Sequence, residues 1–199
     1  MTANVAIIDG GGANIASLQF ALERLGARSQ LTTDVSAIAS SSHIILPGVG
    51  AAAAAMHKIR SHGLDDVIPK IEQPVLGICL GMQLLASNSD EDGAVCLGVY
   101  PDTATKLPAS SDSPVPNMGW CRLSTTTDSE LLSGISDGSW FYFVHSYALP
   151  VGNRTVGTAT HASEFSAAVS LDNFHAVQFH PERSSAAGAR LLKNFLEMR

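Results

Sequence analysis

The chain has 199 residues, 45% of them hydrophobic and 15% charged, a composition that favours one globular domain over residues 1–199 and argues against a fibre or a disordered tail. Its 18 acidic and 12 basic residues give a net charge of −6, and no cluster of Lys and Arg occurs, so we expect no nucleic-acid partner. Because no segment resembles a signal peptide or a membrane span, we expect a cytoplasmic protein that does not interact with a membrane.

Short apolar runs alternate with helical stretches through the first half of the chain. We expect strands at residues 5–8, 43–46 and 75–78, and a helix over residues 15–25 that a glycine closes. The alanine run at residues 51–55 favours the start of another helix. Strands that alternate with helices predict an α/β fold, with a mostly parallel central sheet between layers of helices.

The second half of the chain has a different pattern. Residues 87–112 are rich in Ser, Asp, Gly and Pro, and short β-like runs follow at 140–144 and 167–171. We expect extra antiparallel strands and long loops within the same domain. The chain then returns to a strand at 175–179 and a helix over 185–198.

Metals and cofactors are not expected. The three cysteines are an odd number without close pairing, which argues against a disulfide scaffold and against a zinc site, and Cys96 and Cys121 fit small buried hydrophobes. The glycines at residues 10–12 fail as a dinucleotide fingerprint because Ile15 stands where the motif needs glycine or alanine, and no P-loop motif occurs.

Cys79 carries the sharpest local signal. It lies between two glycines, after the strand at 75–78 and before a helical stretch at 82–86, which is the form of a nucleophile elbow. A cysteine at a helix N-terminus is also favoured as a thiolate. The alternative is a buried cysteine that acts as a small hydrophobe.

His180 and Glu182 follow the last predicted strand and could supply the base that such a nucleophile needs. Residues i and i+2 of an extended segment project to one side, and Pro181 favours an extended His180. Glu182 could therefore accept the imidazole N–H, unless the segment is only a solvated strand end. Because sites gather beyond the carboxyl ends of parallel strands, we expect Cys79 and His180 to converge.

The loop after residues 43–46 could hold an oxyanion. Gly48, Val49 and Gly50 can bring backbone N–H groups close to a reacting centre, and the N–H of Leu80 is a second candidate donor.

Two motifs together resemble the class I (triad) glutamine amidotransferases, namely Gly77-Ile78-Cys79-Leu80-Gly81-Met82-Gln83 and Phe179-His180-Pro181-Glu182. This family has a flavodoxin-like parallel sheet, so the resemblance implies a single-domain, three-layer flavodoxin-like fold. The segments Pro47-Gly48-Val49-Gly50 and His145-Ser146-Tyr147 are similar to those of the glutaminase subunits of imidazole glycerol phosphate synthases, from histidine biosynthesis.

The resemblance implies a two-step reaction on glutamine. Cys79 would attack the side-chain carboxamide, and His180, oriented by Glu182, would protonate the departing ammonia and then activate water against a γ-glutamyl thioester. The residues that resemble the glutamine-binding parts of the family are Gly81, Gln83, His145, Ser146 and Tyr147.

The resemblance also implies a partner. Ammonia would pass to a cyclase subunit with a (β/α)8 barrel, bound as a heterodimer, which makes imidazole glycerol phosphate and AICAR. The positions that resemble the partner interface are Asn14, Met118 and Trp120, although a tryptophan could equally lie in the core.

Three other functions stay open. The chain could supply ammonia for anthranilate or pyridoxal phosphate synthesis, which the two loop segments argue against. It could be a stand-alone cysteine hydrolase, which would work at full rate without a partner. It could also be a non-catalytic binding module, although a module has no structural need of Cys79, His180 and Glu182 together.

Overall fold

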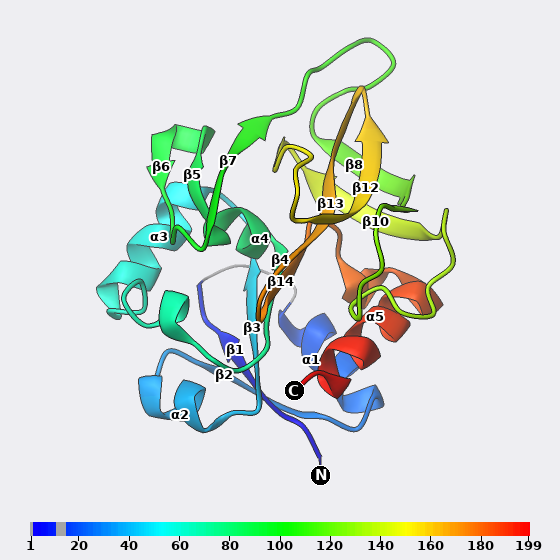
Figure 1. The fold of residues 1–199 in the computed structure, drawn as a ribbon. Helices are drawn as coiled ribbons and strands as arrows, with labels where there is room; N and C mark the ends of the chain where they lie inside the picture. Colours follow the sequence, from blue (N-terminus) through cyan, green and yellow to red (C-terminus); the bar gives the residue numbers. More distant parts are fainter. Residues whose placement is uncertain (1, 11–14) are drawn as a thin grey trace.

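The computed structural model describes residues 2–10 and 15–199, and its centre is an eight-stranded sheet (Figure 1). The strand order is β2-β1-β3-β4-β14-β13-β12-β9. The parallel strands are β2 (Arg28–Thr32), β1 (Asn4–Ile8), β3 (His43–Gly48), β4 (Val75–Cys79) and β14 (Phe174–Val177). The antiparallel ones are β13 (Ser163–Leu171), β12 (Thr155–His161) and β9 (Ser124–Thr125). The parallel part has the flavodoxin-like order 2-1-3-4-5 when β14 is counted fifth, which confirms the predicted fold class.

Helices cover both faces of this sheet. One face packs against α1 (Ile15–Arg24) and α5 (Ser185–Glu197), and the other against α2 (Val35–Ser40), α3 (Ala52–Ser61) and α4 (Leu80–Leu85). Successive side chains of a strand point to opposite faces, so Val5 and Ile7 lie in the first core and Ala6 and Ile8 in the second. Burial on both faces explains why the central strands are apolar without alternation.

Two smaller sheets lie beyond the central one. A four-stranded sheet has the order β11-β7-β5-β6, and β8 pairs with β10 in a separate antiparallel pair. Their bounds are β5 (Ala86–Ser89), β6 (Ala94–Val95), β7 (Tyr100–Lys106), β8 (Asn117–Arg122), β10 (Trp140–His145) and β11 (Tyr147–Ala148). Short 3-10 turns complete the chain at η1 (Ile68–Lys70), η2 (Glu91–Gly93) and η3 (Pro181–Arg183).

Some predicted elements differ from the observed ones. The helix expected over residues 82–86 begins earlier, at Leu80, and the strand expected over 175–179 ends at Val177. Strand β2 was not predicted, because it is a polar edge strand whose side chains are mostly exposed and so carries no hydrophobic pattern. Strands β6 and β7 and most of β5 lie within the stretch predicted as loops and extra sheet, but β5 begins at Ala86, which was predicted to end the preceding helix.

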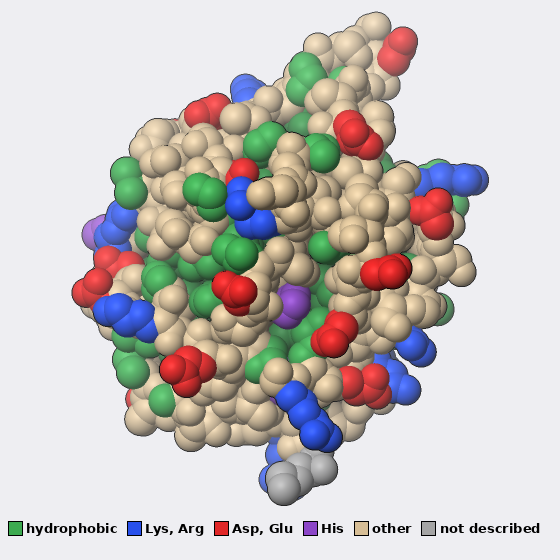
Figure 2. All heavy atoms as spheres, in the orientation of Figure 1, with side chains coloured by type: hydrophobic (Ala, Val, Ile, Leu, Met, Phe, Trp, Pro, Cys, Tyr) green, Lys and Arg blue, Asp and Glu red, His purple; other side chains and the backbone are tan. Residues whose placement is uncertain are grey.

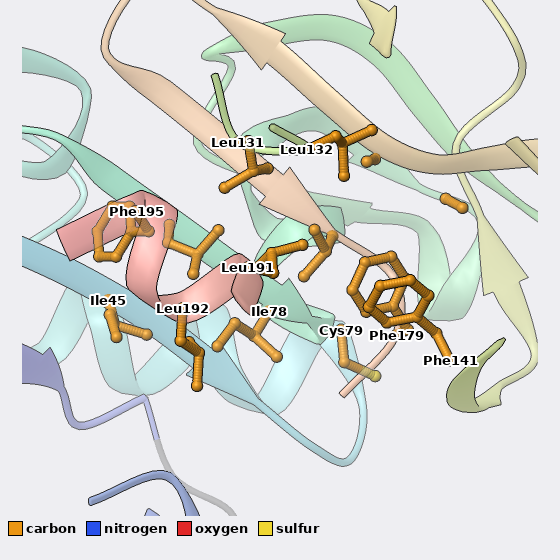
Figure 3. Close-up of a cluster of buried hydrophobic side chains, with 14 of the residues drawn as sticks. Ile45, Ile78, Cys79, Leu131, Leu132, Phe141, Phe179, Leu191, Leu192 and Phe195 are labelled. Atoms are coloured by element: carbon orange, nitrogen blue, oxygen red, sulfur yellow. The ribbon is translucent and has the colours of Figure 1, made fainter. Parts of the chain in front are cut away.

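The apolar core reaches the carboxyl edge of the sheet. Figure 3 shows Cys79 at one end of a buried cluster, beside Phe179 and Phe141. The ring centroids of Phe141 and Phe179 lie 4.0 Å apart, so β10 packs against the segment that follows β14.

On the surface, Figure 2 shows Lys and Arg interspersed with Asp and Glu on one face, without a basic patch there. Among the described helices, none has the length and apolar character needed to cross a bilayer.

Candidate active site

Three segments meet at the carboxyl edge of the sheet. Strand β4 lies between β3 and β14, with Gly48 opposite Cys79 and Ile78 opposite Val177. The loop after β3, the turn after β4 and the segment after β14 therefore lie side by side. This is the edge at which the sequence predicts a site, because each of these strands ends there.

Helix α4 begins directly after β4, and Cys79 takes the strained position between them with φ of 55° and ψ of −111°. Such an abrupt turn requires the helix to press against the strands. A Cβ on Gly81 would overlap the Leu46 carbonyl oxygen, and a Cβ on Gly77 would lie 2.9 Å from Leu85 Cδ1. The two glycines thus allow the elbow. The Cys79 thiol, 6% exposed, donates a hydrogen bond to the Val144 carbonyl oxygen (3.6 Å).

His180 is held from several sides. Its Nδ1 lies 2.9 Å from Glu182 Oε1, and both side chains are buried. The backbone N–H of His180 donates to the Tyr142 carbonyl (2.9 Å), and the backbone carbonyl of His180 accepts from Ser184 Oγ (2.7 Å). The bond to Glu182 matches the prediction, but the predicted geometry was wrong. Only His180 is extended, and Glu182 lies in η3, so the turn and not a continued strand brings the two together.

Cys79 and Glu182 both act on the imidazole of His180. Burial on its own lowers the pKa of His180, because it disfavours the charged ring. Hydrogen bonds and negative charge from Cys79 and Glu182 outweigh burial and raise the pKa of His180 to about 10. The ring is therefore protonated at neutral pH in the free site.

This pKa predicts a pH-dependent stability. An imidazole in the unfolded chain loses its proton near pH 6.5, whereas folded His180 keeps it to about 10, so the folded state binds more protons across this window. The stabilisation is fully present below pH 6.5 and is lost as the pH rises through 10. In urea unfolding at both ends of the window, we expect the free energy of unfolding of the wild type to fall more than that of His180→Gln. Exposed His62→Gln is the control, and equal falls in His180→Gln and wild type would contradict the prediction.

A cavity of about 230 Å³ opens beside Cys79 and His180. Its small volume suits a ligand the size of an amino acid. Of the residues predicted to bind or stabilise substrate, the cavity wall contains Val49, Gly50, Leu80, Gln83, His145, Ser146 and Tyr147.

Two predicted residues are placed differently. Gly81 does not line this cavity, and its role is the close packing of α4 against β3. Gly48 lines a smaller cavity of about 20 Å³ that shares Val49 and His180 with the first. Leu80 is the first residue of α4, where backbone N–H groups have no partner within the helix, so it keeps the place expected of an oxyanion donor.

Two polar side chains of the site were not predicted. Glu91, in η2, lines the cavity, and its Oε2 accepts a hydrogen bond from the Ala52 N–H (2.8 Å). Gln178 is fully buried and donates from Nε2 to Cys79 Sγ (3.7 Å). Glu91 lies in a polar stretch without periodicity and gives no signal in the sequence. Gln178 could have been found from its place in the motif before His180.

The predicted interface residues Met118 and Trp120 lie on β8 and are 65% and 47% exposed, so the core alternative for Trp120 is wrong. Residues directly opposite in an antiparallel pair share a face, which places Trp140 and Tyr142 of β10 on this side too. We call this surface the β8–β10 face. Asn14, with the rest of 11–14, lies outside the described residues.

Cavity volume alone does not identify the active site. A larger hollow, about 1660 Å³, lies at the opposite end of the molecule, around the start of β1 and the C-terminal residues. Within the described ranges, no group of three His, Cys, Asp or Glu side chains is placed to hold a metal ion.

The chain belongs to the class I glutamine amidotransferase family, because the family model described as "Glutamine amidotransferase class-I" matches residues 6–198. Its similarity to HisH subunits of imidazole glycerol phosphate synthase extends over the full length. It is 45% identical to that of Vibrio cholerae, covering 100% of both chains. It is 47% identical to that of Escherichia coli K12, covering 98% of this chain and 100% of the relative.

Solved structures show the same fold at low sequence identity. A glutamine amidotransferase of Thermotoga maritima superposes with a TM-score of 0.71 at 16% identity, over 99% of this chain and 97% of that one. PurLQS of the same organism superposes with a TM-score of 0.74 at 19% identity, over 98% of both chains.

Proposed function

We propose that the chain hydrolyses glutamine to glutamate and ammonia through Cys79, His180 and Glu182, and delivers the ammonia to a (β/α)8-barrel cyclase subunit in the cytoplasm. The partner would use it to make imidazole glycerol phosphate and AICAR in histidine biosynthesis, the process to which the HisH subunits belong. The observation that carries the proposal is the buried His180–Glu182 bond beside a cavity that also contains the strained Cys79.

The first step forms a thioester. The Cys79 sulfur attacks the side-chain carbonyl carbon of glutamine, and backbone N–H groups at Val49, Gly50 and Leu80 stabilise the negative oxygen that results. His180 is protonated in the free site and gives its proton to the departing nitrogen. The C–N bond breaks, ammonia leaves, and the γ-glutamyl group stays on sulfur.

The second step uses His180 in the opposite sense. Cys79 and Glu182 together keep the pKa of His180 high. Once the sulfur is acylated it no longer carries charge, so the contribution of Cys79 is lost. A neutral imidazole can then take a proton from water while the water oxygen attacks the thioester. Glutamate leaves, and the sulfur regains the proton or pairs with the protonated ring.

Glu91 is the acidic side chain among the residues that line the cavity, and its carboxylate suits the α-ammonium group of glutamine. We expect Glu91→Gln to raise KM by about 10- to 100-fold with a smaller change in kcat, because a hydrogen bond to a charged group contributes about 1.5–3 kcal/mol. Exposed Glu164→Gln is the matched control, and glutamate release across glutamine concentrations measures both. An unchanged KM in Glu91→Gln would show that the ammonium group binds elsewhere.

The β8–β10 face is the proposed partner surface. Its exposed residues are Met118, Trp120 and Trp140. Met118 lies directly opposite Val144, which lines the cavity, so this face adjoins the site. Two guanidinium groups stack on its rings, Arg122 on Trp140 (5.0 Å) and Arg183 on Tyr142 (4.5 Å). Aromatic residues and Arg are typical of interface centres.

Glutamate release by this chain alone, and again with the cyclase partner and its nucleotide ligand, tests the proposal. We expect strong stimulation when both are present, and Trp120→Ala should weaken it without changing the activity of the chain alone. Full activity without a partner would favour a stand-alone hydrolase. Stimulation only by an anthranilate or pyridoxal phosphate synthesis partner would favour the other branch of the family.

A further inference from the structure

Gln178 lies beside the reacting sulfur but has no part in the two steps above. Its side chain is fully buried, and Nε2 donates to Cys79 Sγ (3.7 Å). On the other side, its Oε1 accepts from Gln83 Nε2 (3.1 Å). A neutral thiol is a weak acceptor, whereas an N–H aimed at a thiolate makes a charge-assisted bond.

The orientation of this carboxamide follows from a neighbouring backbone group. The Tyr147 carbonyl can only accept, so the Gln83 atom 2.9 Å from it must be Nε2. The same Nε2 donates to Gln178, which must present Oε1 to it and therefore turns its own Nε2 to the sulfur. The carbonyl thus sets the direction of both carboxamides.

The same carbonyl also accepts from His145, which links it to β8. Burial lowers the pKa of His145 to about 4, so the ring is neutral. Asn117 Nδ2 donates to its Nε2 (3.1 Å), which leaves the proton on Nδ1 to donate to Tyr147 (2.9 Å). Asn117 is oriented in turn by Cys121, whose thiol donates to its Oδ1 (3.6 Å).

We propose that Gln178 is a positioning residue for Cys79, and that Gln83, the Tyr147 carbonyl, His145 and Asn117 form with it a hydrogen-bonded relay that holds an N–H against the sulfur and favours the thiolate. The inference rests on the proposed function. It assigns opposite roles to two neighbours of the sulfur, because the Val144 carbonyl accepts only from the thiol, whereas the Gln178 N–H stabilises the thiolate. Among the described residues, the titratable side chains that share the cavity with this sulfur are His180, His145, Tyr147 and Glu91, and Glu182 faces it through its bond to His180.

The test is the rate at which iodoacetamide alkylates Cys79 as a function of pH, followed by mass spectrometry of the peptide that contains it. We expect Gln178→Met, which has similar length and no donor, to move the pH midpoint of alkylation upward by about one unit or more. Gln178→Glu should move it further, because it also adds negative charge. Asn194→Leu, which removes another buried amide far from the site, should leave the midpoint unchanged.

Gln83→Met provides a second variant if Gln178→Met does not fold, and it should move the midpoint in the same direction because the Gln178 carboxamide is no longer oriented. A midpoint in both Gln178→Met and Gln83→Met equal to that of the wild type would overturn the inference alone. Wild-type Cys79 that reacts no faster than Cys121 at any pH would overturn the proposed function and this inference together.

Discussion

Cys79→Ala should reduce glutamate release by at least about 10⁴-fold, with or without the partner subunit, because the variant has no atom that can form the acyl intermediate. The remaining residues of the site act as a unit with the nucleophile. His180 would have no sulfur to pair with, and the N–H groups near Leu80 would face no oxyanion. We therefore expect the residual rate to approach that of glutamine in water.

Cys96→Ala is the matched control for this experiment. Cys96 is also buried, and burial raises the pKa of its thiol to about 11, which makes it a poor nucleophile at neutral pH. It does not line the cavity. We expect Cys96→Ala to keep near-normal activity, and circular dichroism should show both variants folded. More than one-hundredth of the wild-type rate in Cys79→Ala would refute the thioester route.

Gly81→Ala should lower the free energy of unfolding by about 3 kcal/mol or more, because the new methyl group would overlap a backbone atom. The Leu46 carbonyl belongs to a fully buried central strand, so it cannot move aside without breaking the pairing of β3 with β4. Helix α4 would have to shift outward instead. Because Cys79 directly precedes this helix, a fraction that still folds should also lose activity.

Gly152→Ala provides the comparison, since a Cβ on this exposed glycine would meet nothing within 4 Å. We expect the free energy of unfolding of Gly152→Ala, measured from its urea midpoint, to stay within about 0.5 kcal/mol of the wild-type value. Unfolding by urea, followed by circular dichroism, measures both variants. A midpoint for Gly81→Ala close to that of Gly152→Ala would show that α4 can retreat from β3 at little cost.

The proposed triad could be predicted from the sequence because each part lies in a local pattern. Glycines on both sides of Cys79 indicate the elbow, and His180 with Glu182 two residues later indicates the pair whose bond the structure shows. Their convergence follows from the parallel sheet, whose strands end at one edge. What the sequence could not give is the path of the chain from His180 to Glu182, which turns where an extended segment was expected.

Other parts of the site depend on contacts between distant segments. Glu91 reaches the cavity from a turn that only the pairing of β5, β6 and β7 positions. The relay joins residues from α4, β8, β10, β11 and the segment after β14, which have no common spacing in the sequence. Strand β2 was not predicted for a related reason. It lies at the edge of the sheet, where its side chains are mostly exposed, so its sequence is not apolar.

The two ends of the central sheet have a practical consequence. An exposed, apolar edge strand invites pairing with another chain, and proteins avoid this with short or polar edges. Here one end is β9, only two residues long, and the other is β2, which begins with Arg28 and is largely polar. Neither offers a long template for strand addition between copies. The two end strands of the central sheet are therefore poor templates for amyloid-like pairing between copies of the chain.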